Sequence, residues 1–357
     1  MKNTLTVGAA LLLTTSAAYA GGIDRSGQSI GAIFEDGTYV ELSYGYVTPS
    51  VTGTFTVPAG PAAGLEFGSG NVAPAYGAAG LAFKSDINDD VSVAVIVDQP
   101  FGAAVDYSET DAGYPLAGTS ANVNSTAITL VGQYNFNENL SVHFGPRYLS
   151  ASGDYTAVVG GVPQYASTYE SGNGSGYVAG VAYEREDIAL RVALTYSSAI
   201  DLELDGSVGD LVAKMPESIN LDFQSGVAAD TLVFGSIRWA GWSDAFIKDS
   251  LLPAPLVSYD EDTLSYTLGV GRKFSDSFSG ALSVGYEAAQ GGAASNLAPT
   301  DGNMSIGLGG TYTVGNGMEL TGGVRYVMPG DATTETIGAA FADNSAIAIG
   351  LKVAYTF

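Results

Sequence analysis

The sequence predicts an all-β protein, a transmembrane antiparallel up-and-down β-barrel of about fourteen strands. Apolar residues alternate with small or polar ones along most of the chain, which is typical of strands with lipid on one face and water on the other. Short and long segments between these runs also alternate, as the two rims of an outer-membrane barrel require. Composition agrees, because the 357 residues include 48 Gly and 21 Tyr and only 14% are charged. Soluble domains average about 25% charged residues.

The first twenty residues predict export. Lys2 precedes an apolar core at residues 7–13, and Ala18-Tyr19-Ala20 matches a small-x-small cleavage site. A membrane anchor is the weaker interpretation, because this core is too short to span ~30 Å of hydrocarbon. We therefore expect a signal peptide at residues 1–20 and a mature protein in the cell outer membrane. No later run is apolar and long enough for a transmembrane helix.

The C-terminus carries the clearest strand. Apolar side chains at every second position from Ile347 to Phe357 alternate with small or polar residues that include Lys352. A terminal aromatic residue after such a strand resembles the signal that barrel-assembly machinery reads, so Phe357 is the expected contact. Similar or weaker patterns predict the other strands near 40–46, 75–85, 91–97, 128–134, 140–148, 176–185, 188–196, 219–223, 232–241, 264–270, 278–286, 304–312 and 320–328.

The connections predict which end of the barrel is which. Short turns are expected at 86–90, 135–139, 185–187, 227–231, 275–277 and 315–317. Long connections are expected at 49–73, 104–123, 152–175, 198–217, 242–262, 288–302 and 329–345. The short turns would face the periplasm and the long loops the outside. Tyr residues near both ends of the apolar faces, such as Tyr148 and Tyr355, fit interfacial girdles, although strands favour aromatic residues in general.

Several classes of function are disfavoured by composition. A formal net charge of −24 argues against nucleic-acid binding. The absence of Cys excludes disulfides and thiolate chemistry, and a single His with no Gly-x-Ser-x-Gly elbow disfavours a hydrolase. Acidic runs at 107–111 and 259–262 could bind Ca²⁺, but solvated loop charge is the better interpretation. We expect no enzyme activity, no cofactor and no metal.

Four segments resemble the FadL/TodX family of outer-membrane transporters for long-chain fatty acids and other hydrophobic compounds. They are Asp98-Gln99-Pro100-Phe101-Gly102; residues 191–198 with Asp205-Gly206; residues 215–219 with the Trp-x-x-Trp-Ser segment at 239–243; and residues 296–302 before a Gly-rich strand. The resemblance covers most of residues 75–357. It implies a monomeric fourteen-stranded barrel at 38–357, a short N-terminal hatch at 21–37, a hydrophobic outer groove, an inner ligand site and a kinked third strand that opens the wall sideways.

Pro100 and Gly102 are the residues expected to make that kink. Proline cannot donate to a strand ladder and glycine weakens a strand interior. In lipid, the freed backbone groups must face a cavity or a plug. From the residues alone, a strand end followed by a rim loop is the simpler interpretation; the resemblance favours a kink and a lateral gate formed by Asp98, Gln99, Pro100, Phe101 and Gly102.

Five basic residues fall on the polar phase of their strands and are expected to face the lumen: Arg147, Arg191, Arg238, Arg325 and Lys352. On the lipid face at mid-depth each would cost ~2–4 kcal/mol. Together with His143 they are candidates for binding a ligand's carboxylate. The alternative is that each cation pairs with a lumen acid such as Glu41, Glu287 or Glu319 and braces the barrel, and that His143 is simply a satisfied polar residue.

The expected function is passive uptake of a hydrophobic or amphipathic small molecule, with exit into outer-membrane lipid near the third strand. Leu251, Leu252, Leu256 and Val257 would form an apolar landing patch on an outer loop, unless that loop folds over its neighbour. The main alternative is a general diffusion porin with a wide aqueous lumen. An outer-membrane enzyme and a purely structural barrel are further alternatives.

Overall fold

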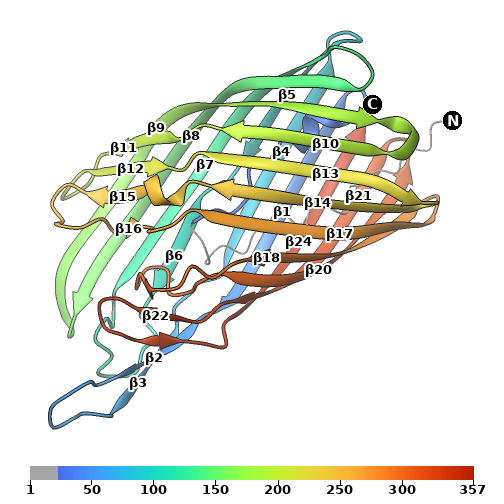
Figure 1. The fold of residues 1–357 in the computed structure, drawn as a ribbon. Coiled ribbons are helices and arrows are strands. Elements are labelled where there is room, and N and C mark those ends of the chain that lie inside the picture. Colours follow the sequence, from blue (N-terminus) through green and yellow to red (C-terminus); the bar gives the residue numbers. More distant parts are fainter. Residues whose placement is uncertain (1–22) are drawn as a thin grey trace.

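The computed structural model describes residues 23–357, which form a closed antiparallel barrel of fourteen wall strands (Figure 1). The predicted fold class is therefore confirmed, whereas the predicted signal peptide lies outside the described residues. Around the wall the strands are β1 (Tyr39–Ser50), β4 (Tyr76–Asp86), β5 (Val91–Asp98) continued by β6 (Gly102–Asp106), β7 (Ser120–Asn135), β8 (Leu140–Val159), β9 (Val162–Arg185), β10 (Leu190–Ser197), β13 (Ser218–Ala228), β14 (Thr231–Ala240), β17 (Thr263–Ser275), β18 (Phe278–Glu287), β20 (Asn303–Gly315), β21 (Met318–Pro329) and β24 (Ser345–Thr356). Within residues 23–357 there is no helix long and apolar enough to cross a membrane.

The barrel closes where its first and last strands meet. β1 and β24 pair along their whole length, from Tyr39 opposite Thr356 to Ser50 opposite Ser345. On β24, the outward side chains of Ile347, Ile349, Leu351 and Val353 are 45–62% exposed, and the inward side chains of Ala346, Ala348, Lys352 and Ala354 are 3–5% exposed. The other wall strands have similar exposed apolar faces. A band of this size needs lipid to cover it.

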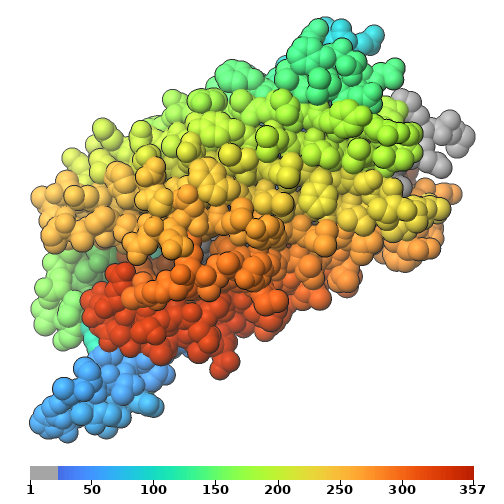
Figure 2. Space-filling model, viewed as in Figure 1, coloured from blue at the N-terminus to red at the C-terminus, as the bar shows by residue number. Residues whose placement is uncertain are grey.

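The two rims differ as predicted, but the long connections are more ordered than expected. The long connections include a five-stranded sheet made of β2 (Thr52–Thr56), β3 (Glu66–Asn71), β19 (Ala293–Ala294), β22 (Ala332–Thr334) and β23 (Ala340–Phe341). Its β2–β3 hairpin projects from the end of the molecule that carries these connections (Figure 2). A second, four-stranded sheet consists of β11 (Ile200–Leu204), β12 (Leu211–Met215), β15 (Phe246–Asp249) and β16 (Val257–Ser258). Inward side chains of this second sheet pack with Ile23 and Phe101 in one apolar cluster.

The prediction of a long loop at 152–175 is wrong. β8 and β9 stay paired up to Val159 opposite Val162, and only Gly160 and Gly161 remain in the turn. Both glycines have positive φ, at 56° and 77°, which suits the tight turn of a β-hairpin. The sequence did not predict this strand extension, because its residues form a ribbon beyond the lipid. They are polar and glycine-rich, and they lack the alternation of apolar and polar residues.

Residues 23–37 lie inside the barrel. The short 3₁₀ helix η2 (Gly31–Phe34) contacts β4, β5 and β7. Its Ile33 packs with Ile30, Val131 and Val178 in an apolar cluster near the inner half of the lumen. Burial of these side chains fixes the segment against the wall.

We predict that Gly145→Ala destabilises the barrel. A Cβ at position 145 would lie 1.7 Å from the Leu130 carbonyl oxygen of the neighbouring strand, so β7 and β8 would have to separate at a cost of about 1–3 kcal/mol or more. Gly132→Ala is the matched control, because its Cβ would find its nearest neighbour at 3.8 Å. Urea unfolding in detergent, followed by the heat-modifiable gel shift of the folded barrel, measures the difference. Equal midpoints for the two variants would contradict the prediction.

Candidate functional site

The third wall strand is interrupted. β5 ends at Asp98 and β6 begins at Gly102. β5 pairs with both of its neighbours, and its pairing with β4 runs from Asp86 only to Leu81. β6 pairs with β7 alone. The outer part of β4, residues 76–80, therefore has no strand partner on this side. This gap in strand pairing between β4 and β6 is called the window below.

The window has defined inner and outer limits. Its inner edge is the last β4–β5 pair, Leu81 opposite Val97. Its outer edge is the hydrogen bond from the Asp106 N–H to the Val72 carbonyl oxygen at 2.9 Å. Between these edges the Ala79 N–H donates to the Gln99 side-chain oxygen at 3.0 Å, so one amide side chain takes the place of a missing strand partner.

Backbone groups at the interruption pair with the N-terminal segment inside the barrel. The Arg25 N–H donates to the Pro100 carbonyl oxygen at 2.7 Å, and the Gly102 N–H donates to the Ile23 carbonyl oxygen at 2.8 Å. Phe101 forms an antiparallel bridge with Asp24. The chain at 99–101 thus turns inward without leaving these polar groups in hydrocarbon, where each would cost several kcal/mol.

The residue types at the interruption explain its geometry. Pro100 has no N–H to offer a neighbouring strand. At Gly102, a Cβ would lie 2.5 Å from the Arg25 guanidinium, so a larger residue here would displace the Arg25 side chain from its present position. The Arg25 guanidinium in turn stacks over the ring of Tyr76 at 4.1 Å, at the β4 side of the window.

Aromatic side chains gather on the lumen side of the interruption. The Phe101 ring packs edge-on against Trp242 at 6.1 Å between centroids, and Trp242 packs against Tyr259 at 5.1 Å. Phe101 and Trp242 are 4% and 2% exposed. Burial, together with the Glu287 carboxylate, raises the pKa of Tyr259, which therefore keeps its phenol proton. This buried cluster lies between the outer four-stranded sheet and the window.

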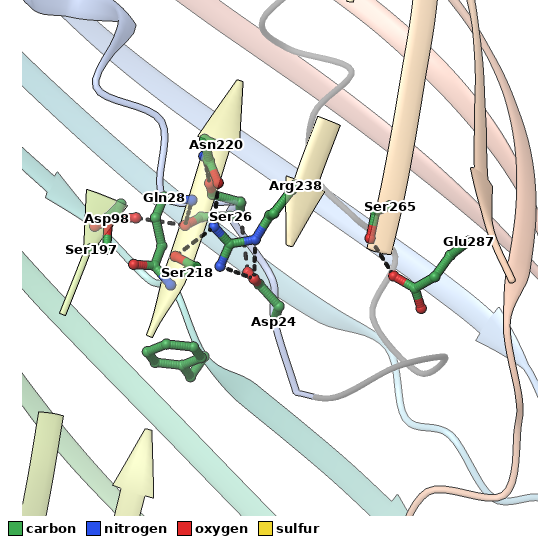
Figure 3. A network of polar contacts seen from close by, with 12 residues as sticks. Asp24, Ser26, Gln28, Asp98, Ser197, Ser218, Asn220, Arg238, Ser265 and Glu287 are labelled. Atoms are coloured by element: carbon green, nitrogen blue, oxygen red, sulfur yellow. Dashed lines mark hydrogen bonds and ion pairs between the residues drawn. The ribbon is translucent and has the colours of Figure 1, made fainter. Parts of the chain in front are cut away.

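Arg238 anchors the N-terminal segment to the opposite wall (Figure 3). Its Nε donates to Asp24 Oδ2 at 2.8 Å, and its Nη1 donates to Ser218 at 3.0 Å and Asn220 at 2.6 Å. Asn220 donates to the Gly27 carbonyl oxygen at 2.8 Å. Both side chains of the Arg238–Asp24 ion pair are largely buried, so water screens it little.

Two further contacts tie this segment to the wall. Ser26 donates to Asp98 Oδ2 at 2.5 Å, which joins the segment to the end of β5 (Figure 3). Arg147 donates to the Gln28 side-chain oxygen and, through Nε, to Thr129 at 2.9 Å. Arg147, Arg238 and the 98–102 segment are thus brought together around residues 23–28.

The remaining candidate cations divide into paired and unpaired groups. Arg191 stacks over the Phe34 ring at 4.9 Å and lies 3.9 Å from Glu184. Lys352 pairs with Glu41 at 3.3 Å. Arg325 lies on β21 with 6% exposure and forms no hydrogen bond or ion pair with any residue in 23–357. The interpretation that each cation pairs with a lumen acid therefore holds for Arg191 and Lys352 but not for Arg325.

His143 and the outer apolar patch lie apart from the window. The His143 Nε2 lies 3.0 Å from Thr195 Oγ1, and its ring packs edge-on against Phe34. In the outer loop, Leu251 is 61% exposed and Leu252 is half-buried, whereas Leu256 and Val257 pack against the apolar cluster beneath the four-stranded sheet.

Sequence reasoning missed several residues that build this site: Asp24, Arg25, Ser26, Gln28 and Asn220. The polar run from Asp24 to Ser29 was the sequence feature that could have indicated them. Such a run inside a barrel, directly before an apolar helix, needs polar partners on the wall. Nothing in the local sequence identifies those partners on distant strands.

Comparisons with known proteins agree with this architecture. A family model described as outer membrane protein transport protein (OMPP1/FadL/TodX) matches residues 31–357. The fold is similar to that of a Pseudomonas aeruginosa FadL homologue, with TM-score 0.71, 16% identity and 91% of each chain covered. It is also similar to the Pseudomonas putida toluene transporter TodX, with TM-score 0.67, 14% identity, and 90% of this chain and 91% of that chain covered.

A third similar structure is the Ralstonia pickettii toluene transporter TbuX, with TM-score 0.63, 12% identity and 97% of each chain covered. No curated protein sequence matches this chain. The family model spans nearly all of the described residues, and the barrel architecture is common to all three structures. The chain belongs to the FadL/TodX family of outer-membrane transport proteins.

Proposed function

We propose that this outer-membrane barrel takes up long-chain fatty acids or similar hydrophobic compounds passively, and that they leave sideways into the membrane through the window between β4 and β6. The observation that carries the proposal is the interruption at Gln99–Phe101, whose backbone pairs with residues 23–25 in place of β4. An apolar molecule that leaves through the wall enters hydrocarbon directly and avoids the aqueous periplasm.

The axial route supports the same direction of exit. Ile30, Ile33 and Phe34 pack against the inner wall beside Val131 and Val178. Below the window, therefore, side chains of the N-terminal segment occupy the lumen. A molecule that has passed the outer sheets meets this packed segment along the axis and the window at the side.

Binding energy would come from burial of apolar surface. Phe101, Trp242 and Tyr259 form an aromatic cluster beside the window, and each methylene group that a cargo buries in the lumen contributes ~0.8 kcal/mol. Relatives of similar fold include toluene transporters, which fits a hydrophobic cargo. We also propose that the protein is a monomer and that its exposed terminal Phe357 is read during assembly.

The alternative function that the sequence allows is that of a general diffusion porin. Bilayer recordings separate the two functions, because a water-filled pore conducts ions steadily. We expect the wild-type barrel to show only small or intermittent conductance, since residues 23–37 pack inside it. A large, steady, open conductance would favour the porin.

We predict that Pro100→Val lowers uptake of a hydrophobic substrate by roughly tenfold or more, the effect of raising a barrier by ~1.4 kcal/mol. Valine supplies an N–H and favours extended backbone, so the strand can pair with β4 across the window. Uptake of a radiolabelled fatty acid into cells that express equal amounts of folded barrel measures the effect.

Pro146→Val is the matched control for that experiment. Pro146 also lies in a wall strand, but it is exposed on the lipid face of β8, which β7 separates from the window. Its replacement should leave uptake unchanged. Unchanged uptake in a folded Pro100→Val barrel would exclude the lateral route.

We predict that Asp24→Asn releases the N-terminal segment. The change leaves the buried Arg238 guanidinium without its ionic partner, and breaking such a pair costs about 3–5 kcal/mol. Trypsin should then cut after Arg25, which is 6% exposed in the intact protein, at least about tenfold faster, while the barrel itself stays folded.

Asp187→Asn is the control for this release. It removes an ion pair with Arg185 whose two side chains are 62% and 45% exposed, and exposed pairs contribute ~1 kcal/mol or less. Cleavage after Arg25 should match that of the wild type. If Asp24→Asn also leaves this cleavage rate unchanged, Asp24 does not hold the segment in place.

A further inference from the structure

Glu287 is a buried carboxylate that lacks a cation. It lies at the end of β18 with its side chain 8% exposed. Its Oε2 accepts a hydrogen bond from Ser265, whereas its Oε1 is buried and has no hydrogen-bond partner in residues 23–357. None of the ion pairs within those residues includes it. A carboxylate removed from water needs a cation or a full set of hydrogen bonds.

Two polar atoms close to Glu287 are also buried without partners. The Trp242 Nε1 and the Tyr259 hydroxyl form no hydrogen bond with any described residue. The two rings pack together with centroids 5.1 Å apart, and Tyr259 is near enough for the Glu287 carboxylate to act, after burial, on its pKa. Nearly all buried polar groups in native proteins have a partner. A group that can both donate and accept is therefore missing from this place.

The N-terminal segment is anchored beside these three side chains. Arg238 is opposite Ser265 on β17, and Ser265 is opposite Glu287 on β18. Glu287 thus lies two strand spacings, ~10 Å, along the wall from the guanidinium that holds Asp24. Figure 3 shows Ser265 and Glu287 on the strands next to this ion pair.

The predicted mature N-terminus is long enough to reach Glu287. Cleavage after Ala20 leaves Gly21-Gly22 before Ile23, so the new terminus is three residues from Asp24. Three extended residues span at most about 10 Å, which matches the separation of Arg238 from Glu287. A free α-amino group is largely protonated at neutral pH and, as an ammonium, has three N–H donors.

We propose that the α-ammonium group of Gly21, which removal of the signal peptide creates, forms an ion pair with Glu287 inside the barrel. The ammonium donates to Glu287 Oε1 and to the Tyr259 hydroxyl oxygen, and a glycine carbonyl oxygen accepts the Trp242 N–H. Asp24 is not its partner, because Asp24 already pairs with Arg238. The inference rests on the predicted cleavage after Ala20 and is independent of the route of transport.

The proposal makes signal-peptide removal a step in the completion of the lumen. In an uncleaved precursor the Gly21 nitrogen is an uncharged amide, and twenty further residues precede it. Such a chain has no cation to offer Glu287 from this position. Processing would therefore fix the outer end of the segment that backs the window.

The experiment measures how readily the N-terminal amine reacts. The purified barrel in amphipol is treated briefly with acetic anhydride at neutral pH, then quenched, unfolded and digested, and mass spectrometry quantifies acetylation of the tryptic peptide 21–25. Only the unprotonated amine reacts, and an ion pair holds the proton. Glu287→Gln should therefore raise the acetylation rate at least about tenfold, the effect of one pKa unit, and Glu287→Asp should fall between.

Glu203→Gln is the matched control, because it makes the same chemical change at an exposed position of the outer four-stranded sheet. Its acetylation rate at Gly21 should equal that of the wild type, with exposed Lys248 as the internal reference. Trypsin cleavage after Arg25 in the folded barrel should stay slow in Glu287→Gln, since Arg238 still holds Asp24.

Three results would overturn the proposal. The first is an equal acetylation rate in wild type and Glu287→Gln. The second is a mature chain whose first residue is not Gly21. The third is cleavage after Arg25 that accelerates in Glu287→Gln as much as acetylation does, because Glu287 would then hold the whole segment by packing.

Discussion

The requirement that every backbone polar group in a bilayer has a partner determines this structure. Most wall strands meet it through two neighbouring strands. The third strand and residues 76–80 of β4 do not, because Pro100 and the inward turn end their pairing. Residues 23–25 supply the missing hydrogen bonds from inside the lumen. The gap in strand pairing therefore depends on the segment within the barrel, because without that segment these backbone groups would have no partners in lipid.

Charge distribution follows from the same constraint. The lipid face carries Leu, Val, Ile and aromatic residues. The buried and largely buried cations within the wall strands are Arg147, Arg238, Arg325, Lys84 and Lys352, and protein groups pair with most of them. The Arg238–Asp24 pair shows what such a contact contributes in this setting. It gains little as general stabilisation, because desolvation offsets attraction, but it fixes the position of the chain that backs the window. The apolar cluster of Phe101 and Trp242 extends this arrangement to the outer four-stranded sheet.

The sequence predicts the wall well because the bilayer imposes a strong pattern on it. Every second residue of β24 from Ile347 to Val353 must be apolar, and such a pattern is read without knowledge of any contact. The extension of β8 and β9 to Gly160 was not predicted, because a ribbon in water has no such constraint.

Pro100 and Gly102 marked the site of the interruption. Its partners could not be predicted, since Asp24 and Arg238 are 214 positions apart in the chain and only the closed barrel brings them together. For the same reason the sequence offered six lumen candidates as equals, and only the contacts separate Arg325 from Arg147 and Lys352.

The seam between β1 and β24 has a consequence for biogenesis. Its two strands are the first and the last of the wall, so the wall is an open sheet with two unpaired edges, Tyr39–Ser50 and Ser345–Thr356, until these strands pair. Unpaired strand edges recruit other chains. A polypeptide that lacked β24 would leave the long edge of β1 unpaired, and such an edge favours aggregation over closure of the barrel.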